Sequence, residues 1–260
     1  MKKILLVEGN LKEANQEFTE NGIKTHTESL QESISYYTNS LEIDSVNPSS
    51  DKDIFNKVKD LNKYEGLIWG GSSLNIYSDT KEIRRQIEFM KECQKKIKNI
   101  LAICWGMQVA VTAAGGVVNR GKNGAHRGIA HEIVINSDGL NHPIYKDKDK
   151  IFNTPAFNYD EVVTLPKDAI LLSSNKVNNV MALNFETEFS KIWGIQYHPE
   201  ITYEKMITLI KFRRERLLEN KSFSDEKDLE SHISMIEKED KITKKESRMR
   251  ELKNWLDLIA

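Results

Sequence analysis

The chain has 260 residues, which is enough for one large domain or for one domain with an appendage. Its 39% hydrophobic residues can fill a sizeable core, and a formal net charge of -1 gives no overall attraction to nucleic acid or anionic membranes. No apolar stretch reaches transmembrane length, and the two cysteines imply no disulfide framework. We therefore expect a cytoplasmic protein that binds neither nucleic acid nor membrane.

The first hundred residues alternate short apolar runs with helical stretches. Residues 4–7 predict the first strand, because the run is too short for a signal peptide and Glu8 ends it. Further strands are expected over residues 41–46, 66–69 and 100–103, and helices over residues 11–21, 54–61 and 80–96. This alternation is typical of parallel β-α-β units and predicts an α/β fold with a doubly wound, mostly parallel sheet.

Cys104 lies at the end of the fourth predicted strand. A predicted helix follows Cys104 and ends at Gly115 and Gly116, so the segment has the layout of a nucleophile elbow. At such an elbow the N-terminus of the helix points at the nucleophile and favours a thiolate over a thiol. The other cysteine, Cys93, falls in a polar helical stretch and is interpreted as a bystander.

An activated cysteine needs a base and a group that orients the base. His198 lies at the end of a predicted strand over residues 192–197, and Pro199 fixes the backbone so that Glu200 can hold the imidazole from behind. In isolation a buried cysteine or a His-Pro pair is more often structural. Together, in this order, they form a candidate catalytic triad of Cys104, His198 and Glu200.

These segments resemble class I (triad-type) glutamine amidotransferases, which carry Cys-x-Gly-x-Gln and a later His-Pro-Glu. Here the motifs are Cys104, Gly106 and Gln108, followed by His198, Pro199 and Glu200. The standalone form is most similar to the amidotransferase part of GMP synthase. The resemblance covers roughly residues 1–215 and implies a flavodoxin-like fold and a cysteine thioester intermediate.

The resemblance also implies the remaining site residues. The Gly70-Gly71 turn after the third strand is expected to supply an oxyanion-hole N–H from Gly71, and the second donor is the N–H of Trp105. Gly70 and Gln108 are expected to contact the substrate, Gln108 at its amino-acid end. The Trp105 ring is equally compatible with a pocket wall and with a core position.

Two positions depart from the family pattern. Ala102 replaces a glycine two residues before the cysteine, and Asn158 stands where many relatives have a histidine before a similar Asp-Glu-Val. The first departure predicts tight packing at the elbow. The second predicts altered substrate or partner contacts.

The second half of the chain has a different pattern. Strand-like runs over residues 128–136, 169–174 and 180–184 predict a small antiparallel patch attached to the main sheet. A helix is expected over residues 203–220, where the amidotransferase domain (residues 1–220) ends. Residues 221–260 are predicted to form a C-terminal helical extension, which either packs on the core or serves as a docking or homodimer surface.

The expected activity is hydrolysis of the side-chain amide of glutamine or of a γ-glutamyl compound. If glutamine is the substrate, the ammonia can pass to a separate synthase subunit. Two alternatives stay open: a standalone γ-glutamyl amide hydrolase and a catalytically silent binding or regulatory module. No cofactor is expected. No metal is expected either, because the five other histidines show no convincing ligand spacing: His26, His126, His131, His142 and His232.

Overall fold

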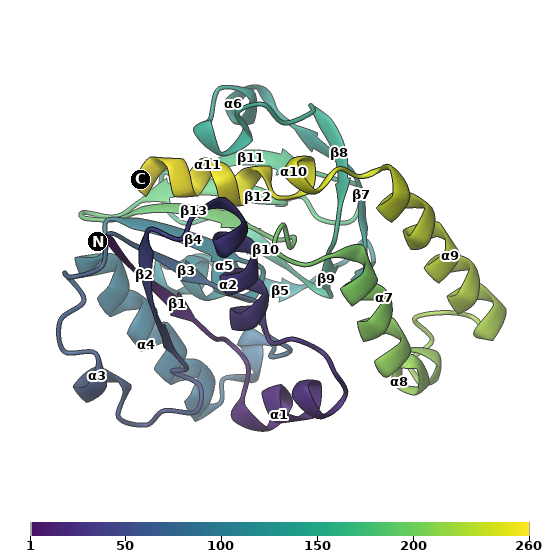
Figure 1. Ribbon diagram of the computed structural model, residues 1–260, viewed down its shortest axis with the longest axis horizontal. Helices are drawn as coiled ribbons and strands as arrows, with labels where there is room; N and C mark the ends of the chain where they lie inside the picture. The colour runs from purple at the N-terminus through teal and green to yellow at the C-terminus, as the bar shows by residue number, and fades with distance from the viewer. Residues whose placement is uncertain (1, 260) are drawn as a thin grey trace.

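The computed structural model describes residues 2–259 and contains a nine-stranded sheet in the order β2-β1-β3-β4-β13-β12-β11-β7-β8. Helices lie on both faces of this sheet (Figure 1). The first five strands in that order are parallel: β2 (Leu41–Val46), β1 (Lys2–Val7), β3 (Gly66–Trp69), β4 (Asn99–Ile103) and β13 (Lys191–Ile195). The predicted doubly wound α/β fold is confirmed.

Alternating side chains of the parallel strands build two cores. Leu5 and Val7 of β1 belong to the cluster beneath α4 (Lys81–Lys96) and α5 (Trp105–Ala113). Ile4 and Leu6 point the other way, into a cluster with α2 (His26–Tyr37) and α11 (Arg250–Ile259). Because successive residues of a strand face opposite sides, one apolar strand supplies both layers.

The predicted antiparallel patch is an extension of the same sheet. Its strands are β12 (Ala182–Glu186), β11 (Ile170–Ser174), β7 (Ala130–Ile135) and β8 (Ile151–Thr154). Two small sheets lie beside it, one formed by β5 (Val117–Arg120) with β10 (Asp160–Thr164) and one by β6 (His126–Arg127) with β9 (Phe157–Asn158).

Several helices differ from the sequence expectation. The helix expected over residues 54–61 is only α3 (Ile54–Lys57), and the one expected over residues 203–220 breaks at Arg213 into α7 (Tyr203–Phe212) and α8 (Arg214–Glu219). Helix α2 was not predicted, although a capping box of Thr25 and Glu28 marks its start. The other helices are α1 (Lys12–Glu20), α6 (Ser137–Leu140) and two 3-10 turns, η1 (Ile76–Ser78) and η2 (Pro143–Tyr145).

The C-terminal segment packs on the rest of the chain in two places. Helix α9 (Glu226–Ile242) lies against α7 at one end of the molecule, and α10 (Lys245–Arg248) leads back to α11, which crosses over the sheet (Figure 1). The α11 residue Trp255 fills the space beside Gly66, where an added Cβ would come within 2.7 Å of the indole. Helix α11 therefore shares its core with the parallel strands, while the division into residues 1–220 and 221–260 stays a prediction.

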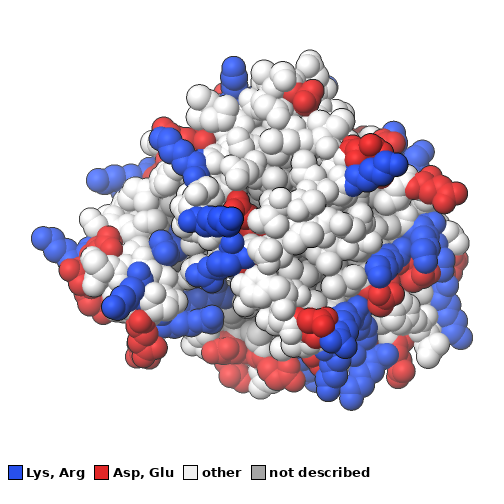
Figure 2. All heavy atoms as spheres, turned by 180° about the vertical axis from the view of Figure 1, so that it is seen from behind, with Lys and Arg blue, Asp and Glu red and all other residues white. Residues whose placement is uncertain are grey.

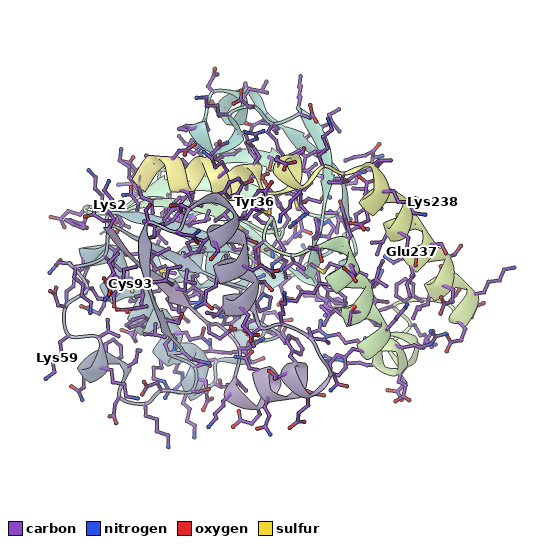
Figure 3. All side chains as sticks on the ribbon, viewed as in Figure 1. Lys2, Tyr36, Lys59, Cys93, Glu237 and Lys238 are labelled. Atoms are coloured by element: carbon purple, nitrogen blue, oxygen red, sulfur yellow. The ribbon has the colours of Figure 1, made fainter. Side chains whose placement is uncertain are left out.

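The surface carries charges of both signs. Figure 2 shows basic and acidic side chains interspersed around a largely uncharged centre on one face. On α9, Glu237 and Lys238 point outward, whereas Cys93 of α4 lies in the interior (Figure 3). Within residues 2–259, none of the helices combines the length and the apolar character needed to cross a membrane.

Candidate active site

Cys104 occupies the sharp turn between β4 and α5. Its backbone has φ 53° and ψ -105°, a strained conformation for a residue with a side chain, and its N–H donates to the Ile195 carbonyl at 2.7 Å. This bond ties the turn to β13, the strand that leads to His198. The structure thus contains the strand-turn-helix elbow that the sequence predicted, with the sulfur at the carboxyl end of the sheet.

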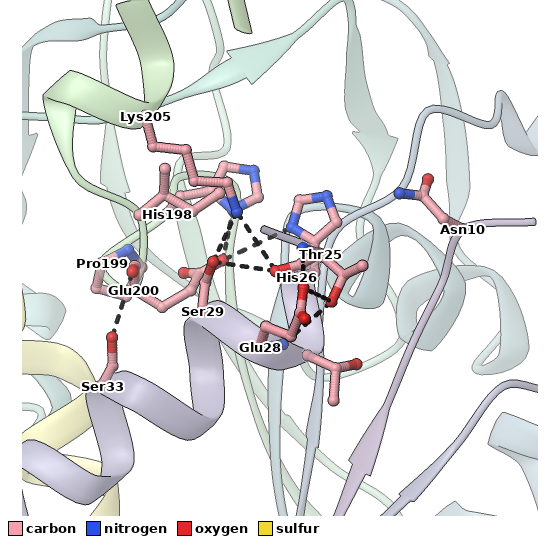
Figure 4. Close-up of polar contacts among 12 residues, drawn as sticks. Asn10, Thr25, His26, Glu28, Ser29, Ser33, His198, Pro199, Glu200 and Lys205 are labelled. Carbon is pink, nitrogen blue, oxygen red and sulfur yellow. Dashed lines mark hydrogen bonds and ion pairs between the residues drawn. The ribbon is translucent and has the colours of Figure 1, made fainter. Parts of the chain in front are cut away.

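His198 and Glu200 lie next to Cys104 in a buried loop after β13. The Nδ1 atom of His198 is 2.7 Å from a carboxylate oxygen of Glu200, and His198 and Cys104 line the same small cavity. The His198 and Glu200 side chains are both almost fully shielded from solvent, and Figure 4 shows them side by side after β13. The carboxylate therefore fixes the ring orientation, as a base beside a nucleophile requires.

The charges in this group stabilise one another. Burial alone would lower the pKa of His198, but the negative charges of Glu200 and of an ionised Cys104 outweigh it and raise the pKa to about 10. Burial acts to raise the pKa of Glu200, and the His198 cation and its hydrogen bond reverse this and hold it well below the usual range. The structure thus favours a protonated His198 beside an ionised Glu200.

The two predicted oxyanion donors lie on segments that meet beside Cys104. The N–H of Gly106 donates to the Gly70 carbonyl at 3.1 Å, which binds the Gly-Gly turn to the first turn of α5. Within residues 2–259, neither the Gly71 nor the Trp105 N–H donates a hydrogen bond. An added Cβ at Gly71 would approach the imidazoles of His26 and His198 to 2.6 and 2.8 Å, so only glycine fits there.

The Trp105 ring proves to be mainly a core group. It is 1% exposed, and its Nε1–H donates to Gln86 of α4 at 2.8 Å. Gln108, one turn into α5, donates to Gln196 at 3.3 Å and reaches the cavity in front of Cys104. The substrate contacts predicted for Gly70 and Gln108 stay predictions.

A polar cavity of about 140 Å³ opens in front of Cys104. Its wall contains one acidic side chain, Asp160, and three basic ones, Arg120, Arg213 and Arg216. Arg213 is partly buried between the rings of Phe157 and Phe18, whose centroids lie 4.8 and 5.8 Å from its guanidinium carbon, and burial lowers its pKa to about 10.

The model of the glutamine amidotransferase class-I family matches residues 22–214. The chain belongs to this family. It is 29% identical over 219 residues to the gamma-glutamyl-L-1-hydroxyisopropylamide hydrolase of a Pseudomonas species, covering 77% of this chain and 74% of that protein. It is 32% identical over 106 residues to a glutamine-hydrolyzing GMP synthase subunit of Methanosarcina acetivorans, covering 41% of this chain and about half (52%) of that protein.

The fold of this amidotransferase also matches solved structures. A glutamine amidotransferase from Thermotoga maritima superposes with a TM-score of 0.67 at 18% identity, over 99% of this chain and 97% of the other. The likeness extends over the whole described chain, so it includes the C-terminal helices that the sequence analysis treated as an extension.

His26, at the start of α2, was not predicted from the sequence as part of the site. Its ring stacks on that of His198, with centroids 5.4 Å apart and planes at 22°, and its Nδ1 is 4.0 Å from Glu200 (Figure 4). Burial lowers the pKa of His26, although Glu200 partly opposes this. Its position 172 residues before His198 gives no local signal, and only the fold brings the rings together.

The fold brings His26, His198 and Glu200 together, a grouping that their spacing in the sequence did not predict. Their ligand atoms lie within 4.8 Å of one another, the kind of grouping that can hold a metal ion. In the amidotransferase the Nδ1 atom of His198 is already bonded to Glu200. A metal ion that bound through this nitrogen would have to replace that hydrogen bond.

Asn158, where many relatives carry histidine, is partnered within this amidotransferase. Its side-chain oxygen is 2.8 Å from Nδ1 of His126, whose Nε2 faces Asn175 at 2.9 Å. Burial lowers the pKa of His126 to about 4, so this imidazole is neutral near pH 7. Because Asn158 lines the polar cavity, the exchange of residue type changes the surface that a substrate meets.

Proposed function

We propose that this protein hydrolyses γ-glutamyl amides through a thioester on Cys104. The observation that carries the proposal is the buried arrangement in which His198 bonds to Glu200 and shares a cavity wall with Cys104. In this role Cys104 is the nucleophile, His198 is the general acid and base, and Glu200 orients His198. The similarity to a hydrolase named for a γ-glutamyl amide, over three quarters of each chain, supports the same reaction class.

The first chemical step forms a bond between the Cys104 sulfur and the γ-carbonyl carbon. The carbonyl oxygen becomes an oxyanion, which the N–H groups of Gly71 and Trp105 stabilise. The carbon–nitrogen bond then breaks, and His198 gives its proton to the departing amine. The two donors come from glycine and from the first residue of a helix, so no side chain intervenes between them and the oxygen.

The second step releases the acyl group. His198, now neutral, takes a proton from water while the water oxygen attacks the thioester carbon. Glutamate leaves, the thiolate returns, and His198 again carries the proton. Glu200 stabilises the imidazolium that the cycle regenerates, and its burial keeps that interaction strong.

The polar cavity suits the amino-acid end of a γ-glutamyl group. That end carries one carboxylate and one ammonium, and the cavity wall offers guanidinium groups and the carboxylate of Asp160. Arg213 donates only to the Ser73 hydroxyl, at 2.9 Å, and forms no ion pair within the described residues. A partly buried guanidinium without a carboxylate is free to pair with the carboxylate of a substrate.

The test is release of glutamate and amine from glutamine and from a panel of γ-glutamyl amides. Cys104→Ser should abolish turnover, while Cys93→Ser should retain it because Cys93 is buried in α4 away from the cavity. The proposal fails if no substrate turns over and if a glutamine-like electrophile does not label Cys104 of the unsubstituted protein. The silent-module alternative then replaces it.

A second candidate is an amidotransferase component that releases ammonia from glutamine for a separate synthase. The match to the GMP synthase subunit of Methanosarcina acetivorans favours it, although that match covers 41% of this chain. Free glutamine would then be the preferred substrate, and its hydrolysis would increase when the partner binds. The two candidates differ in which substrate the isolated chain cleaves faster. Faster cleavage of γ-glutamyl amides favours the hydrolase, and faster cleavage of glutamine favours the amidotransferase component.

A further inference from the structure

Two cavities meet at Cys104. The polar cavity of about 140 Å³ extends toward Gln108, and a smaller one of about 40 Å³ extends the other way. They share several wall residues: Ser72, Ser73, Cys104, Phe157 and Arg213. Only the smaller cavity reaches His198.

Most of the smaller cavity's wall is apolar. It consists of side chains that are 1–8% exposed and that form a separate hydrophobic cluster: Phe18, Ile23, Ile201, Met206 and Leu209. Phe18 comes from α1 and Ile23 from the turn after it, whereas Met206 and Leu209 lie on α7, which follows the catalytic loop. Segments far apart in the sequence thus build one apolar recess beside the base.

The chemistry of the leaving step fixes which part of the substrate faces this recess. His198 protonates the departing nitrogen, so that nitrogen and its substituent lie on the His198 side of Cys104. The acyl chain leaves the same carbon in another direction, toward the polar cavity. The recess is therefore the space into which the amine's substituent projects.

Charged groups around the recess offer little to a charged amine. Burial lowers the pKa of His26, so its imidazole is neutral near pH 7. Lys205 directs its ammonium to the Ser29 hydroxyl at 2.6 Å and to the Thr25 carbonyl (Figure 4). Glu200 is engaged by His198. Arg213 lines both cavities, and under the proposed function its guanidinium pairs with the carboxylate of the γ-glutamyl group. A second ammonium or a carboxylate on the amine would then lose its hydration without finding a free counterion.

We propose that this recess binds the leaving amine and that it selects a small, uncharged, aliphatic amine. A volume of about 40 Å³ accommodates roughly three water-sized groups, which corresponds to an amine with about two or three carbons. The proposal rests on the proposed function and makes it specific: γ-glutamyl alkylamides are the substrates, and glutamine itself is a poor one because ammonia leaves the recess empty.

The test is kcat/KM for γ-glutamyl compounds that differ only in the amine: ammonia (glutamine), methylamine, ethylamine, isopropylamine and benzylamine. Each buried carbon should raise kcat/KM about fourfold up to isopropylamine. Benzylamine should fall sharply because it exceeds the recess. Alanine has the shape of isopropylamine with a carboxylate in place of one methyl group, so γ-glutamylalanine is the charged control and should be cleaved more slowly.

A pair of variants links the preference to the recess. Leu209→Ala enlarges it and should move the optimum to an amine with one or two further carbons. Ile207 lies on the same helix and has a side chain of similar size, but it packs against a cluster that contains the α9 residues Ile233 and Ile236. Ile207→Ala should therefore leave the preferred amine unchanged. Ile23→Val is a milder enlargement and replaces Leu209→Ala if that protein fails to fold.

The outcomes are distinguishable. If glutamine or γ-glutamylalanine is the best substrate, or if the rate is independent of the amine, this inference is overturned while the proposed hydrolase function stands. If no γ-glutamyl compound shows Cys104-dependent turnover, the proposed function fails, and the inference fails with it.

Discussion

The Tyr197 hydroxyl donates a hydrogen bond of 2.7 Å to the Glu251 carboxylate, which joins the residue before His198 to the last helix. Nearby, the buried Arg248 guanidinium donates to the carbonyls of Pro199 and Ile201, on either side of Glu200. The catalytic loop is thus bonded to the C-terminal helices at three of its residues. These helices therefore belong to the scaffold of the site.

Arg248→Ala tests whether this contact positions the triad. Hydrogen bonds from a charged group contribute about 1.5–3 kcal/mol each, and their loss would let the loop relax. Because a small displacement of reacting groups is costly, we expect kcat to fall by about 10- to 100-fold with little change in KM. Steady-state kinetics and the pH profile measure this. Asp257→Asn, on the outer face of α11, is the matched control.

A purely structural role would give a different pattern. Arg248→Ala would then lower the free energy of unfolding while kcat and the pH profile of the folded fraction stayed unchanged. That result would contradict the positioning role.

Among the ion pairs of the described residues that involve lysine or arginine, the Lys148–Glu251 pair is the most deeply buried. The two side chains are 2% and 0% exposed and 3.1 Å apart. Glu251→Leu leaves the Lys148 ammonium buried without its partner, so the free energy of unfolding should fall by about 3–5 kcal/mol in urea titrations. Lys148→Met combined with Glu251→Leu should recover part of the loss, because no isolated charge remains.

The exposed pair of Lys176 and Glu132 provides the contrast. Its side chains are 90% and 64% exposed, so Lys176→Met should leave the unfolding midpoint almost unchanged. A double variant at Lys148 and Glu251 that is no more stable than Glu251→Leu would contradict the explanation by an uncompensated charge.

The charge of Glu200 should set the alkaline limit of activity. It helps to raise the pKa of His198 to about 10 against the effect of burial, so the imidazolium persists until the pH rises through that value. Glu200→Gln removes this charge, and the alkaline limb of kcat/KM should move to lower pH, toward the ordinary histidine value of 6.5. Glu204→Gln, an exposed residue at the start of α7, should not move the limb. An unchanged limb in Glu200→Gln would show that Cys104 alone controls the proton.

The sequence predicted the parallel strands, and it singled out Cys104, His198 and Glu200 as a group, because the signals for both are local. The run from Ile100 to Gly106 contains a strand, a nucleophile and a helix start in seven residues, and His198 and Glu200 are two residues apart. Cys104, His198 and Glu200 then meet because parallel strands bring their carboxyl ends to one edge of the sheet.

The groups that the sequence did not predict depend on distant contacts. His26 reaches Glu200 from α2, whose only local signal was the capping box at Thr25. Arg248 was not singled out from the sequence, yet it is 6% exposed and bonded to the loop that carries His198 and Glu200. Charged residues in polar stretches are usually solvated, so composition favours the wrong interpretation wherever the fold buries one of them.

Gly106→Ala separates packing at the oxyanion hole from helix propensity. In an ordinary helix this change stabilises by about 0.5–1 kcal/mol. Here the new Cβ would lie 2.3 Å from the Trp69 carbonyl oxygen, so α5 and the Gly-Gly turn would have to separate. Because the Gly70 carbonyl bonds to the Gly106 N–H, the Gly71 and Trp105 donors would move apart.

We therefore expect Gly106→Ala to lower both the melting temperature and kcat, the latter by about a hundredfold or more, as for the loss of one oxyanion donor. Ala113→Gly makes the reverse exchange at the other end of α5. It should cost about 0.5–1 kcal/mol of stability and leave kcat unchanged. If Gly106→Ala instead stabilised the protein and kept its kcat, the close approach of α5 to the Gly-Gly turn would have no part in catalysis.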